Sequence, residues 1–274
     1  MKRGFPVGIA CCILLIVLGA VPVSAQLAAP TPAGVSLGAV YYTVPDVAAH
    51  KKIWVEIFGA KPVMVGKTEM LKIPGAFIVL SQGQPGTEAA LVNHFGIWGK
   101  DLNTTREKLK AIGVQNPAQF VDLPNGVRLE FIDDPAGPDV PSAHHIHYFV
   151  ANQQDGLNAR AWYVKTFGAT ENARRNGGVP SALFTTPDKW ISVDFTAAGG
   201  RGGAAAAPPA PNKGKILDRF ALEVKGLDAF VKKIQADGVK VTKPVSTNAD
   251  GLKTAMIVDP LGNEVELIEG LAGK

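Results

Sequence analysis

The amino-acid sequence predicts an α+β fold built from four consecutive copies of one unit. Three observations predict it. An alternating strand, an amphipathic helix and a group of short strands recur in that order four times along 274 residues. Every predicted helix stops at a glycine, the residue that favours a left-handed turn after a helix. One unit alone cannot bury both faces of its sheet, so the units are expected to pair.

The units can be followed along the chain by their strands and helices. Opening strands are expected at residues 38–44, 94–99, 145–151 and 219–224. The helices that follow are expected to end at Gly59, Gly113, Gly168 and Gly238. The last strand of each unit is expected at 77–81, 127–131, 191–195 and 264–268. The pattern of each unit is therefore strand, helix and strand meander.

Helix endings divide the units into two kinds. The first and third read Phe58-Gly59-Ala60 and Phe167-Gly168-Ala169, whereas the second and fourth read Ile112-Gly113-Val114 and Asp237-Gly238-Val239. This alternating order indicates duplication of a two-unit ancestor and favours pairing of consecutive units. The predicted domains are 36–140 (units 1 and 2) and 141–274 (units 3 and 4), with a flexible Gly/Ala/Pro-rich insert at 197–215.

The N-terminus reads as a secretory signal over residues 1–25. Lys2 and Arg3 precede a continuous apolar run, and Val23-Ser24-Ala25 is a small-residue cleavage site. Both cysteines fall within this segment, and Ala/Pro-rich residues 26–35 are expected to form a disordered lead-in. We therefore expect an exported protein, periplasmic or secreted, without a stable membrane anchor after signal cleavage.

Net charge and composition exclude one class of partner. The formal charge of +4 includes two cations of the signal, and no basic stripe or charge block appears. This balance does not favour nucleic acid as a partner. A small-molecule ligand or substrate is the expected partner, for a monomer or homodimer.

Four motifs stand out along the chain: Val44-Pro45-Asp46, Phe58-Gly59-Ala60, Leu222-Glu223-Val224 and Asp259-Pro260-Leu261-Gly262-Asn263-Glu264-Val265-Glu266-Leu267. They resemble motifs of the vicinal oxygen chelate superfamily of glyoxalase I, bleomycin-resistance proteins and extradiol dioxygenases. The resemblance covers nearly all of the chain after the signal. It implies βαβββ modules that pair into curled sheets around a cavity. It also implies metal ligands on the first and last strands of each module.

Strand alternation indicates which side chains face that cavity. At the ligand positions implied by the resemblance, the first strands carry Ala39, His94, His145 and Arg219, and the last strands carry Val79, Glu130, Ser192 or Asp194, and Glu266. Imidazole and carboxylate suit a divalent cation such as Zn, Fe, Mn or Ni. The candidate metal ligands are His94, Glu130, His145 and Glu266, with Glu130 and Glu266 as candidate catalytic carboxylates. The expected cavity-lining residues are Tyr41, Trp98, His147, Phe149 and Arg219.

Two pairings of the modules remain open, and they divide these ligands differently. Consecutive pairing places His94 with Glu130, and His145 with Glu266, in separate cavities. Pairing of modules 2 with 3 and 1 with 4 gathers His94, Glu130, His145 and perhaps Asp194 in one cavity. The alternating order favours consecutive pairing, whereas the number of ligands and the long insert before module 4 favour the other.

The expected function is that of a metal-dependent enzyme of glyoxalase or dioxygenase type acting on a small oxygen-chelating substrate. Such an enzyme would act as a lyase, an isomerase or a dioxygenase. The alternatives are a metal-free binding protein of the resistance type and a degenerate scaffold. In these alternatives His94 is a hydrogen-bonded residue of the strand, and Glu266 forms an ion pair with Arg219.

Overall fold

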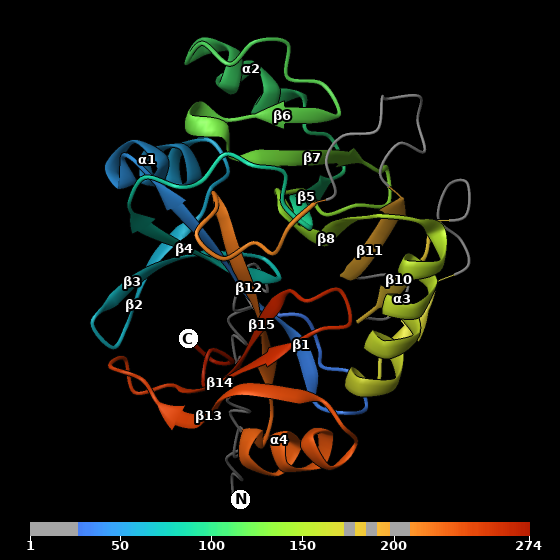
Figure 1. Cartoon of the computed structure of the whole chain (residues 1–274). Coiled ribbons are helices and arrows are strands. Elements are labelled where there is room, and N and C mark those ends of the chain that lie inside the picture. The colour runs from blue at the N-terminus through green and yellow to red at the C-terminus, as the bar shows by residue number, and fades with distance from the viewer. Residues whose placement is uncertain (1–26, 173–178, 185–190, 198–208) are drawn as a thin grey trace, which may run out of the picture.

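The computed structural model describes residues 27–172, 179–184, 191–197 and 209–274, so the predicted signal at 1–25 lies outside the described residues. The α+β architecture predicted from the sequence is confirmed. Four units of strand, helix and further strands build two mixed sheets (Figure 1). No helix within the described part of the chain has the length and apolar character needed to cross a membrane.

The bounds of the elements follow the predicted units. Unit 1 contains β1 (Val35–Val44), α1 (Val47–Glu56), β2 (Lys61–Val65), β3 (Thr68–Ile73) and β4 (Ala76–Gln82). Unit 2 contains β5 (Val92–Gly99), α2 (Asn103–Ala111), β6 (Phe120–Asp122), the 3-10 turn η1 (Pro124–Gly126) and β7 (Arg128–Asp133). Unit 3 contains β8 (Ser142–Val150), α3 (Gln153–Phe167), β9 (Thr170–Glu171), β10 (Ser181–Leu183) and β11 (Ser192–Ala197). Unit 4 contains β12 (Leu217–Val224), α4 (Leu227–Ala236), β13 (Lys240–Thr247), β14 (Lys253–Val258) and β15 (Glu264–Glu269).

The sheets pair unit 1 with unit 4 and unit 2 with unit 3. One sheet has the order β13-β14-β15-β12-β1-β4-β3-β2 and the other has the order β6-β7-β5-β8-β11-β10-β9. In each sheet the opening strands of two units meet antiparallel, β1 against β12 and β5 against β8. The favoured consecutive pairing is therefore wrong, because the chain leaves the first sheet after β4 and returns to it only at β12. Whether residues 36–140 and 141–274 act as separate domains stays a prediction.

The four glycines that end the predicted helices adopt the expected conformation. Their φ angles are positive: 72° at Gly59, 90° at Gly113, 66° at Gly168 and 90° at Gly238. A side chain also caps the start of α1, where Asp46 accepts a hydrogen bond from the backbone of Ala49 at 2.9 Å. Local sequence thus determines both ends of this helix.

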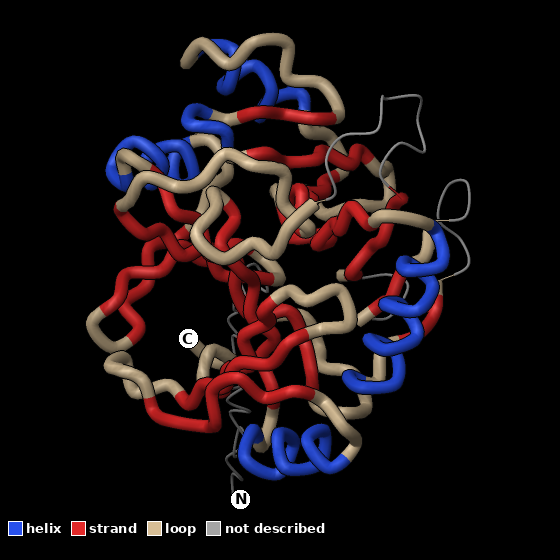
Figure 2. The backbone as a smooth tube through the Cα atoms, in the orientation of Figure 1, coloured by secondary structure: helices blue, strands red, loops and turns tan. Residues whose placement is uncertain are grey.

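The core lies between the helices and the sheets. The helices lie outside the strands (Figure 2). The apolar side chains predicted to face the helices are buried in one continuous cluster; in the opening strands they are Val40, Tyr42, Val44, Phe95, Ile97, Ile146, Tyr148, Val150, Phe220, Leu222 and Val224. The alternation in the opening strands therefore predicted the faces of both sheets. The opposite face of the first sheet carries a second, smaller buried cluster that includes Ala39, Tyr41 and Ala221.

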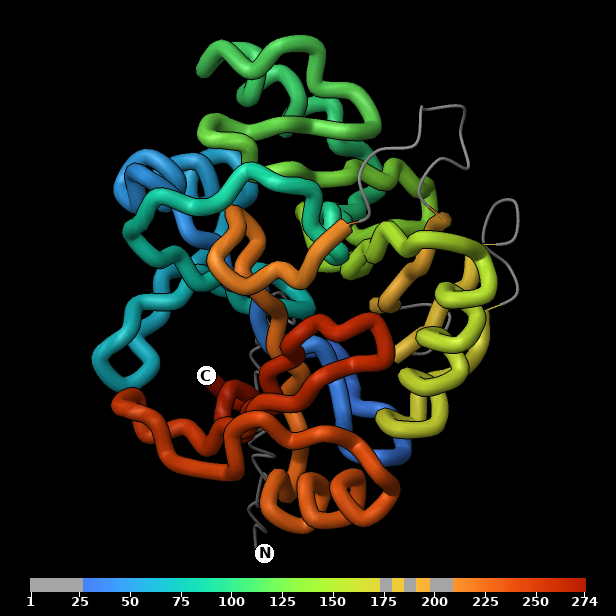
Figure 3. The backbone as a smooth tube through the Cα atoms, viewed as in Figure 1, coloured from blue at the N-terminus to red at the C-terminus, as the bar shows by residue number. Residues whose placement is uncertain are grey.

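Two segments run between the sheets: residues 83–91, between β4 and β5, and residues 209–216, before β12. They lie side by side (Figure 3). They pair through parallel bridges between Gly86 and Lys215 and between Ala90 and Ala210. Asn212 is fully buried, and its side chain bonds both backbone groups of Val92 and the carbonyl of Leu217 at 2.7–2.9 Å. Residues 209–215 of the predicted insert are thus held by buried hydrogen bonds, 198–208 lie outside the described residues, and the flexibility of the insert stays a prediction.

Candidate metal centre

Three neighbouring strands of the second sheet bring the predicted ligands together. In the register of the sheet, Gly96 of β5 lies opposite Glu130 of β7 on one side and His145 of β8 on the other. His94, two residues before Gly96, lies opposite His147. Since side chains alternate along a strand, all four polar side chains share one face of the sheet.

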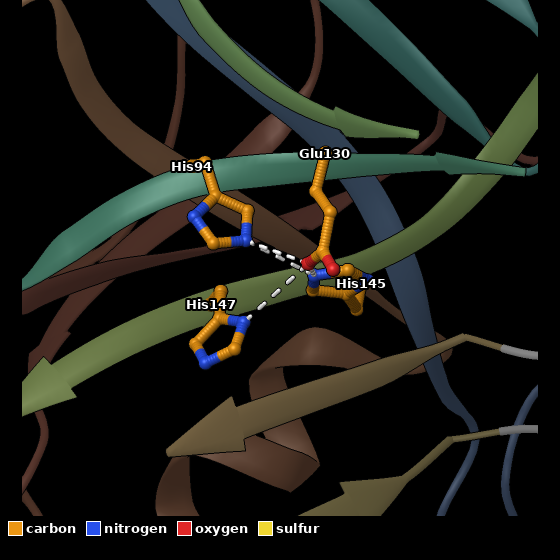
Figure 4. Close-up of side chains that lie close together, drawn as sticks. All are labelled: His94, Glu130, His145 and His147. Carbon is orange, nitrogen blue, oxygen red and sulfur yellow. Dashed lines mark hydrogen bonds and ion pairs between the residues drawn. The ribbon is translucent and has the colours of Figure 1, made fainter. Parts of the chain in front are cut away.

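The four side chains converge on one point (Figure 4). The Oε2 atom of Glu130 lies 3.0 Å from the Nε2 atoms of both His94 and His145, and the two Nε2 atoms are 3.3 Å apart. The Nδ1 atom of His147 lies 3.8 Å from the same oxygen. One ligand atom from each residue falls within a 4.8 Å group, so the predicted set of His94, Glu130 and His145 is assembled and His147 joins it.

Hydrogen bonds from neighbouring residues orient each member of the group, and the Nδ1 atom of His145 contacts Nδ1 of His144 at 2.7 Å. The Nδ1 atom of His94 contacts Asn93 Oδ1 at 2.9 Å, and the Nε2 atom of His147 contacts Thr196 Oγ1 at 2.8 Å. Gln119 donates to Oε1 of Glu130 at 2.7 Å. The outward-facing atoms of the rings and the carboxylate are thus occupied, and the remaining atoms point at one another. Metal sites in proteins show this kind of outer support.

Burial and hydrogen bonding determine the charge of the group. Burial lowers the pKa of His94 to about 3, so the ring is neutral at neutral pH. Burial alone would raise the pKa of Glu130, but the close imidazoles of His145, His147 and His94 outweigh it and hold that pKa well below its usual range. A neutral imidazole and an ionised carboxylate are the forms that bind metals.

The arrangement fits a cation better than it fits hydrogen bonding alone. A neutral His94 that donates from Nδ1 to Asn93 directs a lone pair from Nε2 toward the carboxylate. Nδ1 of His147 is buried and has no hydrogen-bond partner among the described residues. Ligand atoms about 2.0–2.2 Å from one cation lie roughly 2.8–3.6 Å from each other at tetrahedral or cis-octahedral angles. The 3.0–3.3 Å separations fall in that range.

Glu266, also predicted as a ligand, lies in the other sheet. It faces Ala221 of β12 in the register that places Glu130 against Gly96. Two residues earlier, Arg219 occupies the position that His94 has in unit 2, and its Nε bonds Glu266 at 2.9 Å. The guanidinium also stacks on Tyr41 at 3.8 Å. The structure thus does not bring Glu266 to the metal group, since an arginine occupies the equivalent position.

The remaining predicted residues are placed around the metal group or outside it. Phe149 lies 6.2 Å from the His94 ring and 5.7 Å from the His147 ring, whereas Trp98 contacts His144 at 5.6 Å. Tyr41 and Arg219 contact each other on the corresponding face of the other sheet. Asp194, a possible ligand from the sequence, instead accepts hydrogen bonds from Ser181 and Ser192.

Sequence reasoning missed the orienting residues and placed His147 only in the cavity wall. The available signal was the spacing of His145 and His147, since residues two apart in a strand share a face. Gln119 and Thr196 carried no such signal, because their partners lie on other strands.

Comparisons with known proteins agree with this fold. Residues 143–267 match the model of the Glyoxalase/Bleomycin resistance protein/Dioxygenase superfamily. A search of curated proteins found no match.

Three solved structures are similar over most of the chain. Glyoxalase I from Zea mays is 18% identical with a TM-score of 0.63, covering 86% of this chain and 92% of that one. A mutant of the same enzyme is 16% identical with a TM-score of 0.66, and the match covers 86% of this chain and 94% of that one. A protein from Bacillus subtilis provisionally named as a dioxygenase is 13% identical with a TM-score of 0.61, and the match covers 91% of this chain and 88% of that one. Residues 143–267 therefore match the Glyoxalase/Bleomycin resistance protein/Dioxygenase superfamily, and the chain as a whole has the four-unit fold of these solved structures.

Proposed function

We propose that this protein is a metal-dependent enzyme of glyoxalase or dioxygenase type that acts on a small substrate with two neighbouring oxygen atoms. The convergence of His94, Glu130, His145 and His147 carries the proposal. A bound divalent cation such as Zn, Fe, Mn or Ni would supply Lewis-acid stabilisation of substrate oxygens. We also propose export to the periplasm or medium, which rests on the signal pattern of residues 1–25 alone.

The charge of the group favours an oxygen-rich, electron-rich substrate. Imidazoles bind a metal in the neutral form and a carboxylate binds it in the ionised form, so the four ligands together would contribute a charge of −1. A dication would bring the total to +1 in a site where Glu130, His94 and His145 are all buried. Buried charge acts strongly because the surroundings screen it little. An enolate or a phenolate would therefore be stabilised there more than its neutral parent.

Aromatic side chains beside the group suit a partly apolar substrate. The ring of Phe120 lies 5.4 Å from His94, and Phe149 contacts both His94 and His147. Such walls exclude water and leave recognition to a few polar atoms. Glu130 is the carboxylate placed to accept or return a proton, and Gln119 holds its Oε1 atom at 2.7 Å.

Metal analysis of the purified protein tests the proposal. We expect close to one transition-metal ion per chain, lost on His94→Ala, Glu130→Ala or His145→Ala substitution. Glu266→Gln is the matched control: it alters the equivalent carboxylate of the other sheet and should retain the metal. Protein that stays metal-free when the metals are supplied, with unchanged thermal stability, would contradict the proposal and favour metal-free binding.

Turnover by the metal-loaded protein tests the reaction class. Catechol-type compounds and thiol adducts of 2-oxoaldehydes are suitable probes, because each presents two adjacent oxygens. Turnover of either should disappear with chelator and in Glu130→Ala. Turnover that survives both would place catalysis outside this centre.

A further inference from the structure

A cavity separate from the metal centre lies where segments 83–91 and 209–216 meet. It has a volume of about 220 Å³, and its lining includes Tyr42, Asn93, Arg128 and Lys215. Backbone hydrogen bonds of 2.9 Å from Gly86 to Gly214 and from Leu91 to Ala210 hold the two segments together beside it. The cavity is smaller than the ~300–1,000 Å³ pockets of drug-sized ligands. Any occupant must therefore have few heavy atoms.

Hydrogen-bond donors in this cavity lack partners. Tyr42 is 1% exposed, and its hydroxyl has no hydrogen-bond partner among the described residues. The Nε atom of Arg128 is likewise buried without a partner in that part of the chain. A buried polar atom without a partner is energetically costly, so it needs a partner such as an ordered water, an ion or a bound ligand.

Lys215 adds a buried positive charge. The residue is 8% exposed, and its ammonium donates to the carbonyl of Ala89 at 2.7 Å. No carboxylate lies within ion-pair distance of it in the described structure. An ammonium has three donors, and a buried one normally has an anionic partner.

Two carboxylates also line the cavity, but both side chains are exposed. Asp122 is paired with Nη1 of Arg128 at 3.3 Å, and Glu88 is open to solvent. The exposed acids are screened by water, whereas the ammonium is not. The buried part of the cavity thus has an excess of donors and of positive charge.

We propose that this cavity binds a small organic carboxylate, held by the Lys215 ammonium and the Tyr42 hydroxyl. Burial raises the pKa of Tyr42, so its hydroxyl keeps its proton and donates. The amide of Asn93 is a further donor, since its Oδ1 atom already contacts His94. The proposal needs neither a bound metal nor the reaction proposed for the metal centre, although Asn93 also contacts His94 there.

Thermal unfolding of the full protein in acetate, lactate or phosphate, against chloride at equal ionic strength, tests this site. We expect acetate or lactate to raise Tm by about 3–6 °C at ten times Kd, and to raise it further with the logarithm of the ligand concentration. Tyr42→Phe removes only the hydroxyl and should weaken binding at least tenfold. Lys215→Met should abolish it.

Lys213→Met is the matched control, because Lys213 lies in the same segment with a 74% exposed side chain. It should bind as the wild type does. Three results would each overturn the proposal: no rise in Tm beyond that in chloride, equal binding by Tyr42→Phe and wild type, or binding of phosphate alone. If Lys215→Met does not fold, Tyr42→Phe decides, because its ring keeps the core packing.

Discussion

Gly96 is the residue that gives His145 its place in the candidate metal centre. It lies between Glu130 and His145 in the register of the sheet. A Cβ atom at this position would lie 2.1 Å from Nδ1 and 2.3 Å from Cε1 of His145. The imidazole therefore occupies the space that any other side chain would fill.

Gly96→Ala should displace the His145 ring and weaken metal binding by about 10- to 100-fold, as changes to the support of a metal site do. Overpacking of the sheet face would cost about 1–3 kcal/mol of stability. Competition with a chelator measures the first effect and urea unfolding the second. Ala221→Gly, a one-methyl change at the equivalent position of the other sheet, should leave metal affinity unchanged. Equal affinity of Gly96→Ala and wild type would contradict this role.

Single residues show what alternation in a sequence can and cannot supply. It placed His94, Glu130 and His145 on one kind of face, and the structure brings them together. It did not predict the role of Gly96, because a glycine has no side chain whose direction alternation could assign. Its role depends on the His145 ring, which occupies the place of a Cβ atom. Asn93 was also missed, because alternation places it on the opposite face from His94, yet its Oδ1 atom contacts the His94 ring.

Among the elements, the segment before β12 shows a limit of composition as evidence. Its Gly, Ala and Pro content predicted flexibility, yet residues 209–215 are docked through Asn212. The partner residue Val92 is 120 positions away. No local pattern encodes a contact over that distance. Helix ends, by contrast, were predicted well, because a positive φ after the last turn is a local requirement.

Asn212→Ala should destabilise the protein by about 3 kcal/mol or more, because it leaves several buried backbone groups of Val92 and Leu217 without partners. Urea unfolding measures the loss. Lys213→Ala, one residue further on and exposed, should stay within about 0.5 kcal/mol of wild type. Equal stability of the Asn212 and Lys213 variants would show that this segment is not anchored by the buried amide.

At the scale of the whole molecule, each sheet takes one unit from each half of the chain. Repeat order favoured consecutive pairing, and the sheets refute it. The better guide was the number of ligands, since only the other pairing gathers three of them in one hollow. Sequence similarity between repeats records how a chain was duplicated, not which edges meet.

Separate expression of residues 27–140 and 141–274 should give two fragments that do not fold alone. Each fragment would expose the edge strand that meets its partner at β1–β12 and β5–β8. Circular dichroism and unfolding of each fragment, then of the mixture, test this. A cooperative unfolding transition in either fragment alone would contradict it and support the predicted division at residue 140.

A buried polar network joins the two sheets and should make stability depend on pH. Tyr163 donates to Asp259 at 3.1 Å and contacts the Tyr148 hydroxyl at 3.1 Å, and Asn263 donates to Tyr148. Burial raises the pKa of Asp259. The folded state therefore holds this proton to higher pH than the unfolded chain, whose pKa is about 3.9.

It follows that the contribution of Asp259 to stability is highest below the unfolded pKa and falls as pH rises through the folded pKa. Asp259→Asn cannot titrate, so the unfolding free energy of wild type relative to this variant should decrease between pH 4 and pH 8. Urea unfolding at several pH values gives this difference. A difference that is constant or that increases with pH would contradict the predicted direction.

The pairing of the outer units has a consequence for chain connectivity. Leu27 packs against the hydrophobic cluster that contains Leu271, so both ends of the described chain lie at the same cluster. A short linker could join them, and new termini could be opened in the exposed stretch at residues 87–89. In that circularly permuted protein, units would run 2, 3, 4, 1, and each sheet would be made by neighbours in sequence. The same spatial arrangement of four units can thus be reached by two orders along the chain. In one order the outer units pair with each other, in the other each unit pairs with its neighbour, and the two differ only in where the chain begins.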